Sequence, residues 1–251
     1  MLPTPSTNHV NFNRIYEPAE DSFLFLDTLA SNSETAFLSN RFACKTCSSP
    51  LVLEIGTGSG VVLAFVTSWA SKIFGRRDVV TLGTDVNRFA TQASAQTVRN
   101  AISETSKLTG DGLSAGMFCD TVTSDLTTCI RHSQVDVLIF NPPYVPTEEL
   151  PDFLEKSDID EFERDSNLLA LSYAGGDEGM EITNRLLDDL PNILDPERGV
   201  AYVLLCAQNK PKDVKARVRF WPGSWHAETV GDIGKKGGWE KLQIIRIWQT
   251  V

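Results

Sequence analysis

The sequence predicts an α/β fold: a doubly wound, seven-stranded, mostly parallel sheet whose last strand is antiparallel. From residue 51 onward, short apolar runs alternate with segments of helical character. The runs are apolar almost throughout, which is typical of parallel strands that helices cover on both faces. Only a short connection joins the last two runs, so we expect them to pair antiparallel. The 251 residues, 41% of them apolar, are enough for one such core.

The elements follow in chain order, beginning with a short amphipathic helix at residues 20–30. Residues 31–50 are rich in Ser, Asn and Thr and are expected to form mostly a connection. Strands are expected at residues 51–55, 79–84, 116–119, 135–140, 200–205, 227–230 and 242–248. The remaining helices are expected at residues 61–74, 88–105 and 180–194.

The domain organisation is simple. We interpret residues 1–15 as a flexible N-terminal tail and residues 16–251 as a single domain. Residues 148–165 carry nine acidic and two basic side chains. This stretch follows Tyr144 closely, so we expect an acidic insertion at the rim of the site. An ordinary solvated loop is the alternative interpretation.

Composition narrows the possible partners. The formal net charge is −10 and the pI is about 4.8, which disfavours binding to the phosphates of nucleic acid. No apolar run reaches the roughly 18 residues that a membrane span requires, and the N-terminus lacks the apolar core of a signal peptide. We therefore expect a cytoplasmic protein, which could also enter the nucleus. Cys44 and Cys47 supply only half of a zinc-binding pattern, so no metal site is expected.

A glycine-rich turn follows the first expected strand. Gly56, Gly58 and Gly60 alternate with other residues, and glycine allows a sharp turn and close approach of a ligand to the backbone. The dinucleotide fingerprint would need its third glycine at position 61, which is Val61. Glu54, at the strand end, would repel a pyrophosphate but pair with a cationic amine. Both features favour S-adenosylmethionine over NAD as the cofactor.

Two further carboxylates follow later strands. Asp85 ends the second strand and could accept hydrogen bonds from both ribose hydroxyls of a cofactor. Alternatively, it caps the helix that follows. After the third strand, Asp125 could bond an adenine amino group while Leu126 packs on the ring. A plain turn remains the alternative for these two residues.

The motif Asn141-Pro142-Pro143-Tyr144 ends the fourth strand. Neither proline can donate a ladder hydrogen bond, and Asn141 and Pro142 are held extended because each precedes a proline. A rigid group results, with one side-chain amide, two carbonyls and an aromatic ring. It suits recognition of a planar NH2 group, on a glutamine amide or an adenine. A strand-ending turn is the alternative.

Together these signatures resemble the class I S-adenosylmethionine-dependent amino-methyltransferases. The runs from Tyr16 to Ser22 and from Ala174 to Gly179 are similar to those of HemK-type protein glutamine methyltransferases. The resemblance covers residues 14–250 and points to the compact eukaryotic and archaeal branch. It implies methylation of the glutamine in the Gly-Gly-Gln loop of a class I translation release factor. It also implies a heterodimer with a small zinc-binding activator, and places Glu20 and Ser22 in the cofactor wall.

The expected reaction is an in-line displacement at the sulfonium methyl by the glutamine amide nitrogen. Asn141 and the Pro142 carbonyl would accept the two amide hydrogens, Pro143 would complete the substrate contact, and Tyr144 would stack on the flat amide. Three alternatives stay open: methylation of adenine N6 in DNA, methylation of a protein lysine, and a non-catalytic scaffold that only binds the cofactor. If the third strand lies at a sheet edge, we expect its backbone to be available to a partner strand.

Overall fold

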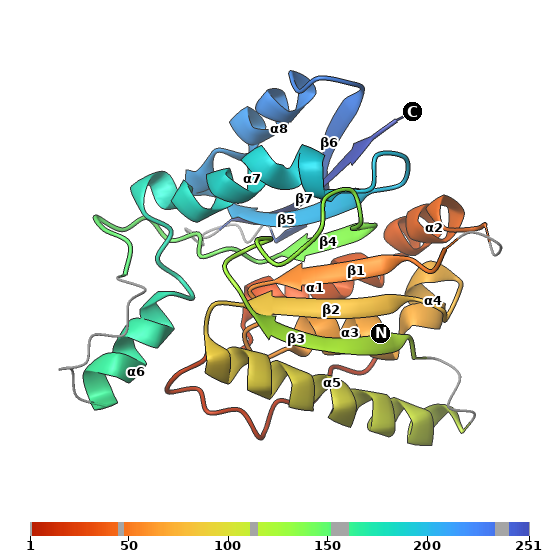
Figure 1. Cartoon of the computed structure of the whole chain (residues 1–251), viewed down its shortest axis with the longest axis horizontal. Helices are drawn as coiled ribbons and strands as arrows, with labels where there is room; N and C mark the ends of the chain where they lie inside the picture. The colour runs from red at the N-terminus through yellow and green to blue at the C-terminus, as the bar shows by residue number, and fades with distance from the viewer. Residues whose placement is uncertain (1, 45–47, 111–114, 152–160, 234–240, 251) are drawn as a thin grey trace.

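The computed structural model describes residues 2–44, 48–110, 115–151, 161–233 and 241–250. Its centre is a seven-stranded sheet in the order β3-β2-β1-β4-β5-β7-β6 (Figure 1). β7 runs antiparallel to both of its neighbours, and the other pairs are parallel. The predicted doubly wound sheet is confirmed. The strands are β1 (Leu51–Ile55), β2 (Val80–Asp85), β3 (Met117–Thr123), β4 (Val137–Phe140), β5 (Val200–Cys206), β6 (Trp225–Ile233) and β7 (Leu242–Gln249).

Helices cover both faces of this sheet. No helix in the described ranges is long and apolar enough to cross a membrane. Short 3-10 turns lie at Asp177–Gly179 (η1) and Ala207–Asn209 (η2). The α-helices are α1 (Glu20–Leu29), α2 (Asn32–Arg41), α3 (Val61–Ser68), α4 (Ala70–Phe74), α5 (Arg88–Thr109), α6 (Glu161–Ala170), α7 (Glu181–Ile193) and α8 (Pro211–Arg219).

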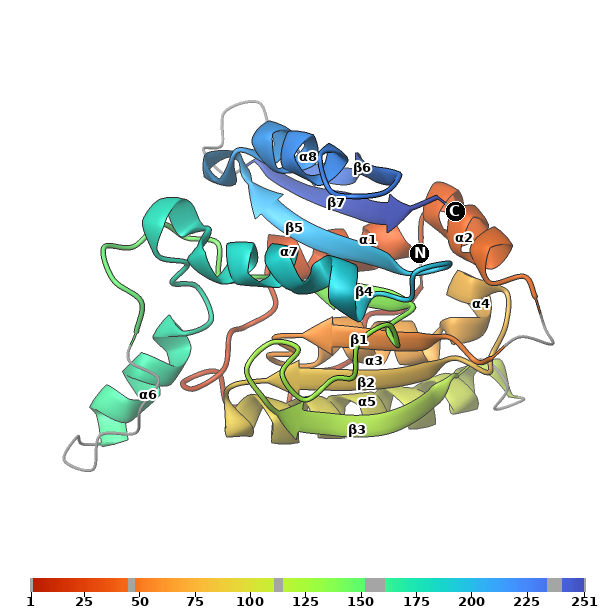
Figure 2. The same ribbon diagram turned by 45° about the horizontal axis from the view of Figure 1, so that its top comes forward.

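The two helical layers enclose separate apolar cores. One core lies between one face of the sheet and the helices α1, α2, α3 and α4. The other core lies between the opposite face and the helices α7 and α8. Alternate residues of β1 serve both cores, since Val52 belongs to the first and Leu53 and Ile55 to the second. This two-sided burial explains why the strand is apolar almost throughout. α6 stands apart from both layers (Figures 1 and 2).

Helix α2 corrects the expectation that residues 31–50 are mostly a connection. Its N-cap is Ser31, whose hydroxyl accepts a hydrogen bond from the Glu34 amide. Glu34 is buried and accepts hydrogen bonds from the Tyr202 hydroxyl and from Arg246, at 2.8 Å each. The helix is stabilised by this long-range polar contact rather than by an apolar stripe, so local periodicity gave no signal for it.

The N-terminal segment also differs from the expected flexible tail. Val10 and Ile15 are buried against Ala90 of α5. The side-chain amide of Asn87 donates to the Arg14 carbonyl at 2.8 Å. These contacts attach the segment along the start of α5. Half of the predicted acidic insertion at 148–165 lies outside the described residues, since 152–160 are not described.

Smaller differences concern element lengths. The helix expected at 61–74 is divided into α3 and α4 at Trp69, whose φ of −111° and ψ of 23° are not helical. β3 extends to Thr123 and forms one edge of the sheet, as its expected position allowed. α8 had no counterpart among the expected elements.

Glu34→Gln should lower the free energy of unfolding by about 3 kcal/mol, because the Arg246 cation then stays buried without its carboxylate partner. Urea denaturation measures this loss. Asp120→Asn is the control, since it removes only the exposed pair between Arg99 and Asp120 and should cost less than about 1 kcal/mol. Equal losses in the two variants would contradict a stabilising role for the buried pair.

Candidate functional site

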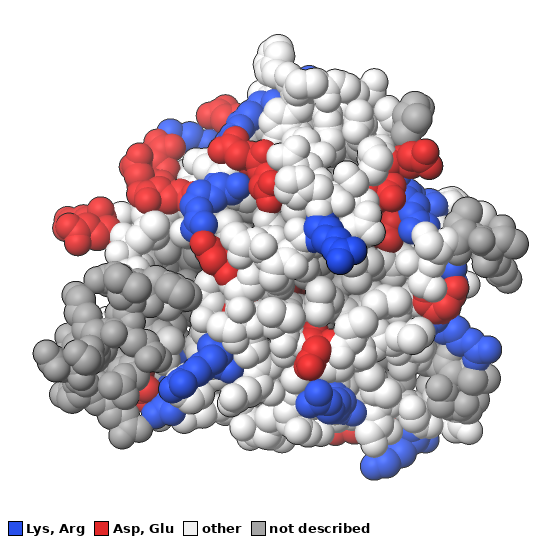
Figure 3. Space-filling model, in the orientation of Figure 1, with Lys and Arg blue, Asp and Glu red and all other residues white. Residues whose placement is uncertain are grey.

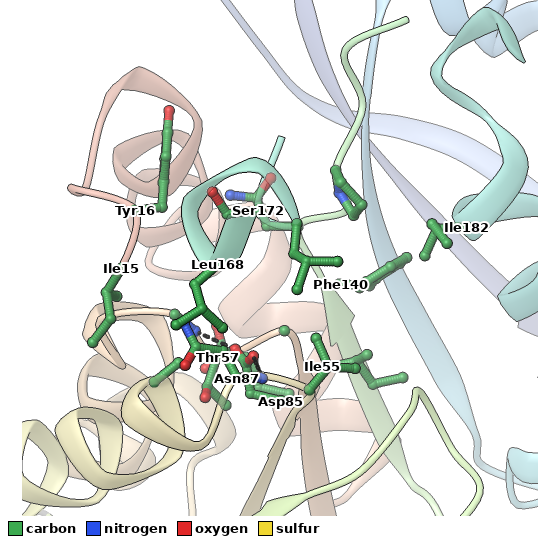
Figure 4. Close-up of a pocket in the computed structure, with 18 of the residues that line it drawn as sticks. Ile15, Tyr16, Ile55, Thr57, Asp85, Asn87, Phe140, Leu168, Ser172 and Ile182 are labelled. Carbon is green, nitrogen blue, oxygen red and sulfur yellow. Dashed lines mark hydrogen bonds between the residues drawn. The ribbon is translucent and has the colours of Figure 1, made fainter. Parts of the chain in front are cut away.

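A cavity of about 400 Å³ opens where the parallel strands β1, β2 and β4 end. β1 and β4 are neighbours although β2 and β3 lie between them in sequence, so the cavity occupies the switch point of the sheet, where α/β folds bind ligands. Figure 4 shows Asp85 and Asn87 at one end of the cavity, and Tyr16 and Ser172 at the other. Its volume falls within the range of small-molecule sites.

The glycine turn after β1 forms one wall. Gly56 and Gly58 line the cavity with φ of 66° and 51°, a left-handed conformation that favours glycine. Gly60 has a different role from the one predicted, because it does not line the cavity. A Cβ at Gly60 would lie 2.5 Å from the Ser94 Cα. Gly60 therefore permits close packing of the turn on α5.

Asp85 joins the first two turns of the site. Its Oδ2 accepts a hydrogen bond from the Gly58 amide at 2.9 Å, and its Oδ1 accepts one from the Asn87 amide at 2.8 Å. The N-cap of α5 is Asn87, whose side-chain oxygen accepts from the Phe89 amide. The alternative interpretation of Asp85 as the helix cap is thus wrong. Burial raises the pKa of Asp85 to about 6.

Glu54 faces the same cavity and is buried. Burial is the main cause that raises the pKa of Glu54 well above its usual value, and the neighbouring Asp85 charge adds to it. Among the described residues, no partner bonds Glu54 Oε2 or the hydroxyl of Thr57, which also lines the cavity. A buried acceptor without a partner is costly. A cationic amine would remove that cost, so these residues fit the cofactor predicted from the sequence.

Asn141 follows β4 and is held by α1. Its side-chain nitrogen donates to Asp21 Oδ2 at 3.1 Å. A carboxylate can only accept hydrogen bonds, so this contact fixes which way the Asn141 amide faces. Asn141 Oδ1 is left buried without a partner in the described part of the chain, and Asn141 lines the cavity. The site therefore presents an oriented hydrogen-bond acceptor.

The rest of the motif is divided between the cavity and the core. Pro143 lines the cavity, whereas Pro142 is buried behind it. Tyr144 does not line the cavity, and its partly buried ring packs against the core that contains α1. The stacking of Tyr144 on a substrate amide stays a prediction.

Asp125 and Leu126 line the cavity as expected. Asp125 also forms an ion pair of 2.5 Å with Arg185 of α7, a residue that the sequence did not single out. Leu126 has a φ of 47°, and its carbonyl accepts from the Thr84 hydroxyl at 3.1 Å. The adenine contacts predicted for these residues remain predictions.

The predicted N-terminal wall is present in part. Ser22 is buried and lines the cavity, whereas Glu20 is exposed at the start of α1 and does not line it. The contact of Asp21 with Asn141 was not predicted from the sequence. The run from Tyr16 to Ser22 was the signal that could have suggested it. Other lining residues that were not predicted include Arg14, Ile15, Tyr16, Thr57, Asn87, Phe140, Leu168, Ser172 and Ile182.

This sheet, with its cavity at the switch point, defines a class I S-adenosylmethionine-dependent methyltransferase. A solved chain from the E. cuniculi Mtq2–Trm112 complex shares the fold, with a TM-score of 0.54 and 23% identity over 95% of this chain and 99% of that one. No family model matches the sequence.

Two relatives identify the family. The chain is 33% identical over 252 residues to the eRF1 methyltransferase catalytic subunit mtq2 of Schizosaccharomyces pombe, covering 99% of this chain and 96% of the relative. It is 32% identical over 226 residues to methyltransferase HEMK2 of Mus musculus, covering 85% and 83%. The chain therefore belongs to the methyltransferase family of mtq2 and HEMK2, in agreement with the predicted resemblance.

Cofactor affinity should rise as the pH passes through about 6, where the buried Asp85 ionises. The ionised forms of Asp85 and Glu54 accept from hydroxyls and pair with an amine, whereas burial favours their protonated forms in the empty protein. Below about pH 6, the affinity for S-adenosylhomocysteine should fall by up to tenfold per pH unit for Asp85. Titration calorimetry measures this dependence.

Asp85→Asn and Glu54→Gln should each make that profile shallower, although both weaken binding. Asp188→Asn is the control, because this exposed α7 carboxylate pairs with Arg217 and does not line the cavity. Affinity that is flat or falls as pH rises would contradict the proposed ionisation.

Arg14 and Asp165 form an ion pair of 2.7 Å that connects the N-terminal segment to α6. Arg14 lines the cavity, and so does Leu168, which follows Asp165 in α6. We therefore expect the ion pair between Arg14 and Asp165 to slow cofactor release. Arg14→Glu should speed dissociation of S-adenosylhomocysteine about fivefold, equivalent to about 1 kcal/mol. Stopped-flow fluorescence measures the rate. The double variant Arg14→Glu/Asp165→Arg should restore slow release, and an additive loss would contradict a direct pairing.

Proposed function

We propose that this protein transfers the methyl group of S-adenosylmethionine to the glutamine side-chain amide of the Gly-Gly-Gln motif in a class I translation release factor. The observation that carries the proposal is the oriented, unpartnered Oδ1 of Asn141 beside the cofactor cavity. The relative mtq2 is an eRF1 methyltransferase catalytic subunit, which supports the same substrate.

On the substrate side, Asn141 Oδ1 would accept one hydrogen of the glutamine NH2 and the Pro142 carbonyl the other. A glutamine nitrogen is a poor nucleophile because its lone pair is delocalised into the carbonyl. Accepting both hydrogens orients the nitrogen and stabilises the positive charge that develops on it. Holding reacting groups in contact accounts for several kcal/mol of a barrier. Pro143 and Tyr144 would complete the contact with the flat amide.

On the cofactor side, Glu54 would pair with the amine, Asp85 with the ribose hydroxyls, and Asp125 and Leu126 with the adenine. Gly56 and Gly58 would keep the first turn open to the ligand, and Ser22 would close the wall opposite. S-adenosylmethionine, when bound, supplies an electrophilic methyl on a sulfonium. The buried carboxylates of Glu54 and Asp85 complement that positive charge. No metal enters this proposal.

The alternative substrates fit less well. DNA adenine methylation would need a basic surface for the duplex, but Lys and Arg are scattered among Asp and Glu on the face shown in Figure 3. The net charge of −10 acts against such binding. A lysine amine must lose a proton before it reacts, whereas the amide nitrogen attacks while neutral, and its methylated product then releases an acidic proton to water. A non-catalytic scaffold would not need to keep Asn141 oriented beside the cavity.

We further propose a heterodimer with a small zinc-binding subunit, which resides in the cytoplasm and can also enter the nucleus. The fold relative was solved as an Mtq2–Trm112 complex, which supports the partner. β3 is the candidate contact, because it forms the sheet edge and Met117 and Val122 are 62% and 38% exposed. A backbone edge of this kind can accept a partner strand.

Asn141→Ala should lower kcat on the order of 10²- to 10³-fold, because the nucleophile loses an acceptor. The assay incubates enzyme, activator and release factor with labelled S-adenosylmethionine. Asp21→Asn, which no longer fixes the Asn141 amide, should lower kcat with little change in cofactor affinity. Replacing the glutamine of the factor should abolish labelling.

Full activity of Asn141→Ala would overturn the mechanism. Labelling that persists after the glutamine is replaced would overturn the substrate assignment, and preferential labelling of duplex DNA would favour adenine instead. Asp120→Asn is a suitable control, because that side chain lies on β3 outside the cavity.

A further inference from the structure

The loop from Ala174 to Gly179 lies against the chain that leaves the Asn-Pro-Pro-Tyr motif. Val145 pairs with Ala174 as an isolated parallel bridge. The Val145 amide donates to the Tyr173 carbonyl at 2.9 Å, and the Gly175 amide donates back to the Val145 carbonyl at 2.8 Å. The loop is therefore bonded to the segment that carries the motif, although about 30 residues separate them in sequence.

Two glycines of this loop meet the motif backbone. A Cβ at Gly175 would lie 2.4 Å from the Pro143 carbonyl oxygen, and one at Gly179 would lie 2.0 Å from the Tyr144 carbonyl oxygen. Gly179 also has a φ of 68°, which favours glycine. Any larger residue at either position must displace the backbone of Pro143 or Tyr144.

Asn209 bonds the same carbonyl and lies beside Gly179, since a Cβ at Gly179 would be 2.8 Å from the Asn209 side-chain nitrogen. Asn209 follows β5 in the chain, and it is only 2% exposed. The side-chain nitrogen donates to the carbonyls of Tyr144 at 3.1 Å, Glu178 at 3.0 Å and Gly179 at 3.3 Å. The side-chain oxygen accepts from the Cys206 amide at 2.8 Å. One carboxamide thus connects the motif, the glycine loop and the end of β5.

We infer that Asn209 and Gly179 are positioning residues that fix the Tyr144 carbonyl and, through it, the acceptor group at Asn141 and Pro142. Neither residue lines the cavity, so neither touches the cofactor there. The inference rests on the proposed function, because it assigns the motif to the nucleophile. It predicts a defect in the chemical step and not in cofactor binding.

The chemistry of the Asn209 carboxamide makes the positioning role specific to asparagine. An aspartate has nearly the shape of an asparagine but offers no donor when ionised. Three carbonyl oxygens would then face a carboxylate. The Tyr144 carbonyl would lose the bond from Asn209 and be repelled, and would keep the longer contact from the Cys206 thiol at 3.9 Å. A shift near 1 Å in a reacting group costs on the order of 10²-fold in rate.

Asn209→Asp should therefore lower kcat on the order of 10²-fold, while the Kd for S-adenosylhomocysteine changes less than about threefold, below 1 kcal/mol. Glu34→Gln is the matched control for lost stability. It disrupts the buried contact between α2 and β7, which includes no residue of the motif or of the glycine loop, and should keep the wild-type kcat at temperatures where both variants are folded.

Gly179→Ala tests the same contact without removing a donor. Its control is Gly110→Ala, where φ is 71° but no atom of the described residues, chain neighbours aside, lies within 4 Å of the new Cβ. Both variants carry the cost of a left-handed alanine, and only Gly179→Ala displaces the Tyr144 carbonyl. We expect a large loss of kcat in Gly179→Ala and none in Gly110→Ala.

A second readout does not depend on the release factor. The side-chain amide resonances of Asn141 in a ¹H–¹⁵N spectrum should shift or broaden in Asn209→Asp and Gly179→Ala, and stay in place in the two controls. Unchanged Asn141 resonances and kcat in Asn209→Asp would overturn the inference, as would equal losses in Gly110→Ala and Gly179→Ala. If wild-type enzyme leaves the glutamine unlabelled, the proposed function fails, and the resonance shifts still decide the positioning role.

Discussion

The pairing of β4 beside β1 is the constraint on which the site depends. In register, Glu54 lies opposite Ile139 and Ile55 opposite Phe140. The glycine turn and the Asn-Pro-Pro-Tyr motif must therefore leave the sheet side by side, although more than 80 residues separate them in sequence. Continuous apolar strands, buried on both faces, enforce this pairing. A slip of one residue would move every side chain of a strand to the opposite face.

Burial then gives the site its electrostatic character. Glu54 and Asp85 are both removed from water, which raises the pKa of each. Two buried carboxylates disfavour a phosphate in this cavity, and the unpartnered oxygen of Glu54 favours a cationic group. The same turn that admits the ligand is fixed by the bond from the Gly58 amide to Asp85. Cofactor choice and backbone conformation thus depend on the same carboxylate.

The sequence predicted the parts of the fold and site that have local signals. Apolar runs predicted all seven strands, and alternating glycines and strand-ending carboxylates predicted the cofactor wall. Helix α2 escaped prediction because its stability comes from the contact of Glu34 with Arg246, which is more than 200 residues away in sequence. The N-terminal segment escaped for a similar reason, since polar residues surround the few apolar side chains that bury it. The role of Gly60 was mistaken because spacing does not reveal which neighbour a glycine approaches.

The two halves of the site differ in how the chain builds them. The cofactor half comes from turns that directly follow β1 and β2, so its residues are recognisable in short windows. The substrate half depends on Asn141, whose amide is oriented by Asp21 of α1, while the carbonyl of nearby Tyr144 is bonded by Asn209 after β5. These contacts span 120 and 65 residues. Because Asp21 and Asn209 both hold it, the acceptor group of the motif loses little conformational freedom when a substrate arrives. A weak amide nucleophile requires such a preorganised site.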